Sequence, residues 1–153
     1  MSLKDGKDMH SRELMEFFRS ACRQAGMKVT RQRLHIYLEL LKSGDHPTAE
    51  TLFSRLRPPM PQLSLDTVYR ALSTFEQTGL IRRVNTVKSQ ARYEAQMNPH
   101  HHFVCNTCGT VIDFDWPVFD QETLPETVLK LGTVSLRTVT VSGICCKCSG
   151  KKG

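Results

Sequence analysis

The sequence predicts an α+β protein built in two parts. Residues 1–93 show amphipathic helical patterns followed by a short hairpin pattern, whereas residues 100–153 are organised around two Cys-x-x-Cys pairs. We expect residues 94–99 to form the hinge between the two parts. A chain of 153 residues is long enough for one core or for two small ones.

Composition restricts the class of protein. Hydrophobic residues make up 39% of the chain and charged residues 24%, which is typical of a folded protein in water. No apolar run approaches the roughly 20 residues that cross a bilayer, and no apolar segment follows the charged start. We therefore expect a cytoplasmic protein with no membrane partner, whose six cysteines are reduced and available to bind metal. The net charge of +6 permits a nucleic-acid partner.

Four helices are predicted in the first part from apolar residues at helical spacing. The first spans residues 11–25. Thr30, Thr48 and Ser64 can each cap the start of a further helix with a side-chain oxygen. The fourth helix should end at Gly79, because glycine readily adopts the left-handed conformation of a helix C-terminus.

The outward face of the fourth helix carries groups that suit DNA. Thr67, Arg70 and Thr74 lie opposite the apolar stripe, and Tyr69 lies at its boundary. Hydroxyl, guanidinium and aromatic groups can contact phosphates, base edges and thymine methyl groups. A helix face of this kind can also be merely solvated, so the neighbouring elements decide between the two interpretations.

A basic hairpin favours the DNA interpretation. Residues 80–84 and 91–94 show strand patterns. The basic residues on or beside them are Arg82, Arg83, Lys88 and Arg92. Helices followed by such a hairpin form a winged helix, in which the fourth helix enters the major groove. The residues predicted to contact DNA are Ser64, Thr67, Tyr69 and Arg70 on this helix, and Lys28, Arg31 and Arg33 in a basic cluster before it.

Two cysteine pairs organise the second part. Cys105-x-x-Cys108 and Cys145-x-x-Cys148 supply four soft ligands, the set that a closed tetrahedral zinc site needs. A small domain with few large apolar residues is stabilised by such a cross-link. The alternative is four free buried cysteines. Cys22 and Cys146 fall outside the pattern, and we expect them to be ordinary thiols.

Histidines form a second constellation. His100, His101 and His102 run toward Cys105, and alternation along a strand places the first and third on one face. Imidazole and carboxylate ligands suit iron(II), manganese or zinc and are harder than sulfur, so a second, different metal site is predicted. The alternative is a solvated strand end. The further potential ligands are Glu94, Asp113 and, far upstream, His46.

The segment between the cysteine pairs predicts one helix and one strand. We expect a helix over residues 118–131, despite Pro125, and a strand over residues 133–141, which are rich in β-branched side chains. An exposed apolar strand in a short domain can pair with a second copy of itself. The sequence therefore predicts a homodimer.

These motifs together resemble the ferric uptake regulator family, from about Gly26 to Cys148. The motifs that carry the resemblance are Thr30-Arg-Gln-Arg33, His46-Pro-Thr-Ala49, Ser64-Leu-Asp-Thr-Val-Tyr-Arg70, Gly79-Leu-Ile81, Arg92-Tyr-Glu94, His100-His-His-Phe-Val-Cys105, Cys108-Gly109, Asp113-Phe114 and Gly143-Ile-Cys145.

The resemblance implies a winged-helix DNA-binding domain, a hinge and a dimerisation domain in which the four cysteines hold structural Zn²⁺. It also implies a regulatory site for Fe²⁺ or Mn²⁺, or alternatively Zn²⁺. The ligands of that site would be His46, Glu94, His100, His102 and Asp113. Ligands from both sides of a hinge favour one orientation of the domains, so the metal-loaded dimer would bind palindromic A/T-rich operator DNA and repress transcription.

Within the family, the stretch Asp113-Phe-Asp-Trp-Pro117 resembles the peroxide-responsive branch, in which bound iron(II) reacts with hydrogen peroxide and oxidises its own ligands. Glu94 instead resembles iron-uptake regulators, since peroxide sensors commonly carry aspartate there. We predict peroxide sensing, with an iron-uptake or zinc-uptake regulator as the alternative. A further metal site of the family is not predicted, because its positions are occupied by Pro99, His101, Asp120 and Arg137.

Two other classes of protein stay as alternatives. Three histidines with carboxylates can also hold a metal with an open position that activates water, as in a zinc hydrolase. The predicted recognition helix and the lack of a further catalytic motif argue against an enzyme. A zinc-ribbon module for RNA or protein would show little preference for palindromic duplex DNA and no dependence on a second metal.

Overall fold

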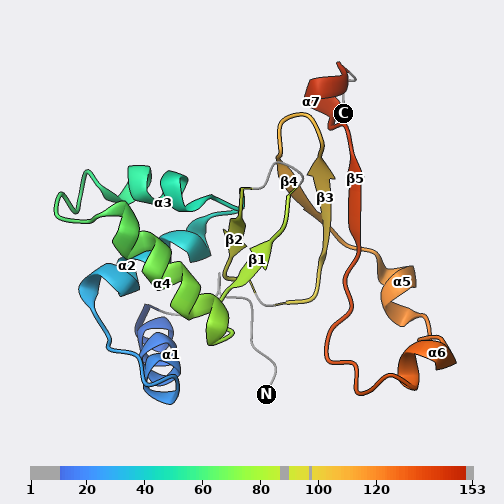
Figure 1. The fold of residues 1–153 in the computed structure, drawn as a ribbon, viewed down its shortest axis with the longest axis horizontal. Helices are drawn as coiled ribbons and strands as arrows, with labels where there is room; N and C mark the ends of the chain where they lie inside the picture. The colour runs from blue at the N-terminus through green and yellow to red at the C-terminus, as the bar shows by residue number, and fades with distance from the viewer. Residues whose placement is uncertain (1–10, 87–89, 97, 151–153) are drawn as a thin grey trace. The chain divides into compact units, whose positions relative to one another are not determined.

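The computed structural model describes residues 11–86, 90–96 and 98–150. The chain divides into two compact units, Met1–Asn98 and Pro99–Gly153, whose elements are labelled in Figure 1. Across the described ranges, no helix is both long enough and apolar enough to span a membrane. Lys88, predicted beside the hairpin, lies outside the described residues.

The first unit begins with a layer of helices (Figure 1). Their bounds are α1, Ser11–Gln24; α2, Arg31–Lys42; α3, Ala49–Leu56; and α4, Leu65–Gln77. Thr30, Thr48 and Ser64 cap α2, α3 and α4 as predicted, because each side-chain oxygen accepts a hydrogen bond from the backbone N–H three residues later. Gly79 follows α4 with φ of +71°, the left-handed conformation expected there.

An aromatic cluster lies at the centre of this unit. The ring centroids of Phe18 and Tyr37 are 5.2 Å apart, and Phe75 meets them edge-on at 5.9 and 6.0 Å. Val68 and Leu72 of α4 are fully buried beside this cluster. Burial of one face of α4 fixes which of its side chains point outward.

A short antiparallel hairpin follows the helices. Strand β1 (Arg82–Val84) pairs with β2 (Arg92–Glu94), with Arg82 opposite Glu94 and Val84 opposite Arg92. The helices and this hairpin make the first unit a winged helix. The backbone N–H of Tyr93 donates to the carbonyl oxygen of Pro47, which ties β2 to the loop between α2 and α3.

The second unit is a three-stranded sheet with short helices. Strand β3 (His101–Cys105) lies between β4 (Val111–Phe114), which is antiparallel to it, and β5 (Thr140–Gly143), which is parallel (Figure 1). The helices are α5, Pro117–Gln121; α6, Glu126–Leu129; and α7, Cys146–Ser149. The protein is therefore α+β, with a winged helix followed by a small α/β domain.

Two predictions for the second unit were wrong in detail. The helix predicted over residues 118–131 is split into α5 and α6, because Pro125 has no N–H to continue a helix and instead precedes α6. The strand predicted over residues 133–141 is confined to residues 140–143. Pairing of this segment with β3 begins at Thr140, opposite His102. Val139 just before it accepts a hydrogen bond from the N–H of His102, and residues 133–138 belong to no described strand.

Candidate metal centres and the outward face of α4

The four predicted cysteines are brought together at one end of the second unit. Cys105 ends β3, and Cys108 follows it in a tight turn. Cys145 directly precedes α7, and Cys148 lies within α7. Their sulfur atoms all lie within 4.8 Å of one another, and the sulfurs of Cys108 and Cys145 are 3.8 Å apart. A tetrahedral zinc ion with bonds of about 2.3 Å holds its sulfurs about 3.8 Å apart. The donor set and spacing therefore fit a structural zinc site.

The electrostatics of this cluster also fit a cation. Backbone N–H groups, first that of Cys108 and then that of Cys145, lower the pKa of the Cys105 thiol to about 5. Hydrogen bonds with the sulfurs of Cys145 and Cys108 raise the pKa of Cys148 to about 12. The thiol of Cys105 therefore ionises readily, whereas ionisation of Cys148 is opposed, as expected where several sulfur atoms lie close together. A divalent cation removes that opposition.

The remaining cysteines lie outside the cluster, as predicted. Cys22 is buried in the core of the first unit, and burial raises the pKa of its thiol. Cys146 is exposed on α7, between two cysteines of the cluster in the sequence, and it is not among the four grouped sulfurs.

The first unit contains two of the five predicted regulatory ligands. His46 lies in the loop between α2 and α3, and Glu94 ends β2. The Nε2 atom of His46 is 2.9 Å from Oε2 of Glu94, and both side chains are about 95% buried, with 4% and 5% exposed. Burying a carboxylate is costly unless it is paired with a hydrogen-bond donor or a cation. The pair therefore has the chemistry of a buried half-site for a metal.

The second unit contains the other three. His102 of β3 lies opposite Asp113 of β4, and His100 precedes β3 on the same side. The Oδ1 atom of Asp113 is 3.6 Å from Nε2 of His100 and 3.5 Å from Nε2 of His102. Ligand atoms that share an ion at about 2.1 Å lie roughly 3.0 to 3.4 Å apart, so this spacing is close to that of a metal-bound set.

His101 is on the opposite face, as the alternation predicted. The backbone N–H of Val139 donates to its Nδ1 atom at 3.1 Å, and its Nε2 atom is 3.2 Å from Oδ1 of Asp120. The guanidinium of Arg137 donates to the backbone carbonyl oxygens of Asp120 and Glu122 and lies 5.2 Å from the ring centroid of Phe119. The positions where the family has a further metal site are thus occupied here by a cluster of hydrogen bonds centred on Arg137.

The outward face of α4 has its own polar contacts. The hydroxyl of Tyr69, which is 44% exposed, donates to the carboxylate of Glu50 on α3. This hydrogen bond lowers the pKa of Glu50 and raises that of Tyr69. The Nε atom of Arg70 is 2.9 Å from Oδ2 of Asp66, an exposed pair that contributes little to stability. These contacts orient both side chains without burying them.

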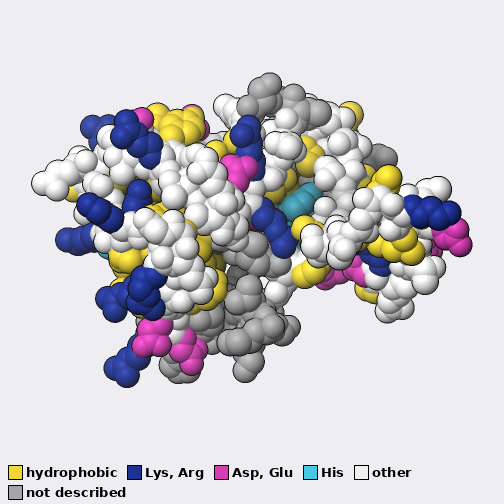
Figure 2. Space-filling model, turned by 60° about the horizontal axis from the view of Figure 1, so that its bottom comes forward, with side chains coloured by type: hydrophobic (Ala, Val, Ile, Leu, Met, Phe, Trp, Pro, Cys, Tyr) yellow, Lys and Arg dark blue, Asp and Glu magenta, His cyan; other side chains and the backbone are white. Residues whose placement is uncertain are grey.

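The other residues predicted to contact DNA differ in their exposure and hydrogen bonds. Ser64 caps α4, and its hydroxyl is 2.8 Å from that of Thr67. Lys28 and Arg31 are exposed, whereas Arg33 is half-buried and donates to the carbonyl oxygen of Lys28 at 2.8 Å. Figure 2 shows Lys and Arg side chains spread over the helical unit on the face drawn.

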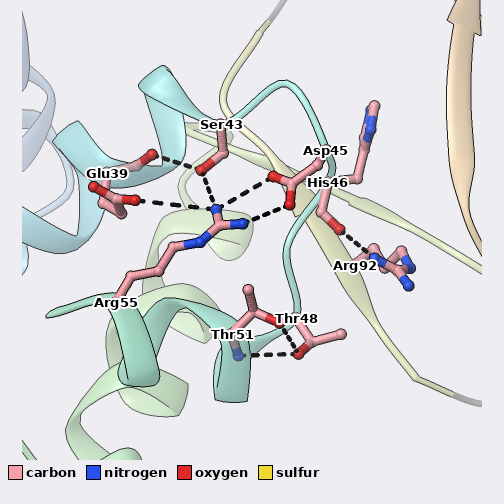
Figure 3. A network of polar contacts seen from close by, with 8 residues as sticks. All are labelled: Glu39, Ser43, Asp45, His46, Thr48, Thr51, Arg55 and Arg92. Atoms are coloured by element: carbon pink, nitrogen blue, oxygen red, sulfur yellow. Dashed lines mark hydrogen bonds and ion pairs between the residues drawn. The ribbon is translucent and has the colours of Figure 1, made fainter. Parts of the chain in front are cut away.

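Sequence reasoning did not predict the residues that support His46. Arg92 lies on the hairpin, as predicted, and its Nη1 atom also donates to the carbonyl oxygen of His46 at 3.0 Å (Figure 3). Arg55 holds Asp45, the residue before His46, through two hydrogen bonds of 2.6 and 3.3 Å. The one indication in the sequence was that only the short stretch from Asp45 to Pro47 separates two predicted helices.

Fold and sites together define a winged-helix protein whose second domain has four cysteines that fit a structural zinc site and further groups suited to bind metal. Residues 24–139 match the sequence profile of the ferric uptake regulator family. The chain belongs to this family.

Individual relatives agree with the assignment. A peroxide-responsive repressor of Staphylococcus aureus is 30% identical, over 86% of this chain and 89% of its own length. The ferric uptake regulator of Helicobacter pylori, described as having three functional metal binding sites, superposes with a TM-score of 0.79 at 26% identity, covering 95% and 97% of the two chains. The manganese-containing structure of the Pseudomonas aeruginosa ferric uptake regulator gives a TM-score of 0.68 at 32% identity, covering 83% and 96%.

Replacing one sulfur ligand should unfold the second unit selectively. We expect Cys108→Ser to lose the bound zinc and the protease resistance of residues 99–150, because apparent zinc-binding energies of about 10–16 kcal/mol are also folding energies. Zinc content and limited proteolysis measure the two effects. The matched control is Cys146→Ser, an exposed cysteine outside the cluster. A Cys108→Ser protein that keeps its zinc and its resistance contradicts the assignment.

Proposed function

We propose that this protein is a cytoplasmic, metal-dependent transcriptional repressor that binds palindromic A/T-rich operator DNA as a homodimer. The observation that carries the proposal is the division of metal ligands between the two units. His46 and Glu94 form a buried pair in the first unit, and His100 and His102 gather around Asp113 in the second.

We infer that both half-sets serve one regulatory site. When bound, Fe²⁺ or Mn²⁺, or alternatively Zn²⁺, supplies positive charge shared by ligands of both units. His46 and Glu94 then restrain the first unit relative to the second across the hinge at residues 94–99. A dimer reads two half-sites only if its recognition helices are about 34–36 Å apart, so such a restraint selects the DNA-binding arrangement. A shift from a minor to a dominant state requires a few kcal/mol of differential affinity.

The winged helix supplies the DNA contacts in this proposal. The exposed hydroxyl, guanidinium and phenol groups of α4 face outward, and in the major groove they would meet base edges. Lys28, Arg31 and Arg33, before and at the start of α2, would contact the phosphate backbone. Because Tyr69 and Arg70 are held by neighbouring carboxylates on the surface, DNA must compete for them, which favours specific over general contacts.

The second unit supports dimer formation. Its exposed large hydrophobic residues are Ile112, Trp116, Val118, Leu129, Leu131, Val134, Leu136, Val141 and Ile144. Apolar side chains concentrated on so small a unit mark an association surface. Residues 133–138, which belong to no described strand, can pair with a second copy of the chain, which gives a two-fold symmetric dimer.

Within this function we propose peroxide sensing through the regulatory site. The resemblance of residues 113–117 to the peroxide-responsive branch supports it, as does the peroxide-responsive repressor of Staphylococcus aureus that the chain resembles. In the reaction, one oxygen of hydrogen peroxide is added to an imidazole ring carbon and the other leaves as water. An oxidised His46 or His102 no longer holds its position. Glu94 favours the second candidate, an iron-uptake regulator that responds to metal level only.

Loss of the ligand from the first unit should abolish regulation without unfolding the protein. We expect His46→Ala to form a folded dimer whose operator affinity no longer increases with added manganese, because the first unit then lacks its imidazole ligand. Fluorescence anisotropy of operator DNA with and without Mn²⁺ measures this. The matched control is His35→Ala on α2, outside both ligand sets. If added manganese still increases operator binding by His46→Ala, the proposal of one site shared by both units is contradicted.

Substitution on the recognition helix should weaken specific binding. Arg70→Met should lower operator affinity by roughly tenfold or more, since one bidentate base contact is worth about 1–3 kcal/mol. Arg57→Met removes an equal charge from the end of α3 and is the control. Binding titrations with operator and with scrambled duplexes distinguish loss of base recognition from loss of charge. Equal losses for the two variants on both duplexes speak against base recognition by Arg70.

The bound metal should decide the response to peroxide. Iron(II)-loaded protein on its operator should dissociate after a brief low-dose peroxide pulse, because iron(II) promotes the oxidation of its histidine ligands, whereas manganese-loaded protein should stay bound. Gel-shift assays under anaerobic conditions compare the two. Retention of the iron-loaded complex would favour the iron-uptake candidate.

A further inference from the structure

The backbone of His46 is strained. Its φ is +49°, and His46 is the only described non-glycine residue with positive φ. The residue is followed by Pro47, and a residue before proline is biased toward extended conformations, so the left-handed conformation is disfavoured twice. Such conformations persist only where the surroundings impose them, and they concentrate at functional sites.

One side of the loop is held by Arg55 of α3 (Figure 3). Its guanidinium binds both carboxylate oxygens of Asp45, with Nη2 to Oδ2 at 2.6 Å and Nη1 to Oδ1 at 3.3 Å. The same Nη1 atom donates to the hydroxyl of Ser43 at 3.1 Å, and that hydroxyl donates to the carbonyl oxygen of Glu39 in α2. The residue before His46 is thereby anchored to two helices.

The other side of the loop is held by β2. Arg92 donates to the carbonyl oxygen of His46 at 3.0 Å, and the N–H of Tyr93 donates to that of Pro47 at 3.1 Å. Glu94 is the next residue of the same strand, and its carboxylate is the one that meets Nε2 of His46. The strand that provides one candidate ligand therefore also fixes the backbone of the other.

We propose that Arg55 and Arg92 are positioning residues that clamp His46 in its left-handed conformation, so that its imidazole is set beside Glu94 before metal arrives. The clamp rests on the proposed function of this site. Preorganised ligands lose less freedom on binding an ion, so the clamp raises affinity for the regulatory metal. Because Arg92 and Glu94 share β2, the clamp also links the metal half-site to the wing of the DNA-binding unit.

The test is a cobalt(II) titration of full-length, zinc-loaded protein, in which the second ion is followed by its visible absorption. Arg92→Met and Arg55→Met should each weaken cobalt binding by about tenfold, as is typical when groups that orient metal ligands are removed. Arg92→Lys keeps a donor and should restore most of the affinity. Arg83→Met removes a similar charge from the paired strand and should bind as wild type.

A thermal melt without cobalt distinguishes positioning from general stabilisation. Because loss of a clamp contact also releases backbone strain, the melting temperature of the zinc-loaded variants should stay close to that of wild type while cobalt affinity falls. The clamp is overturned if both Met variants bind cobalt as tightly as wild type. It is likewise overturned if their melting temperatures fall while their affinity for cobalt is unchanged. A wild-type protein that takes up no second cobalt ion overturns the proposed function itself.

Discussion

The grouping of four cysteine sulfurs is the constraint on which the second unit depends. Among its described residues, the buried hydrophobic ones are Val104, Cys105, Val111 and Cys145, and two of these belong to the cluster. These apolar side chains are too few to stabilise the unit by themselves. Coordination of zinc by the four cysteines takes the place of hydrophobic packing. Strand β3 ends in Cys105 and carries His102 three residues earlier, so a zinc ion at the cysteines would also fix the position of a proposed regulatory ligand.

The first unit is stabilised in a different way. Its aromatic cluster and buried helix faces form a conventional core, and this core leaves one loop in a strained conformation where His46 meets Glu94. Stability supplied by the packed helices thus maintains a ligand geometry that the local sequence disfavours. The two units position their proposed ligands by different means: the first through packing and hydrogen bonds, the second through a sheet that ends at the cysteine cluster.

The features predicted best from sequence depend on neighbouring residues. Caps at Thr30, Thr48 and Ser64 and the cysteine pairs are local patterns with a direct physical cause. The strand predicted at residues 133–141 was wrong for most of its length, because pairing depends on a partner that the alternation pattern does not specify. The clamp on His46 joins residues 10 to 46 positions apart and leaves no periodic signal. Arg92 was predicted on or beside the hairpin, where it lies, while its contact with the loop follows from tertiary structure.

The central claim, that one regulatory site draws ligands from both units, is tested most directly by finding where peroxide places oxygen. Iron(II)-loaded protein is given a brief low-dose peroxide pulse under anaerobic conditions, and its peptides are compared by mass spectrometry with those of manganese-loaded protein treated identically. With iron only, we expect one added oxygen per oxidised molecule, on His46 in some molecules and on His100 or His102 in others. Oxidation confined to one unit would contradict a shared site. Unmodified histidines, with operator binding that simply follows iron concentration, would contradict peroxide sensing.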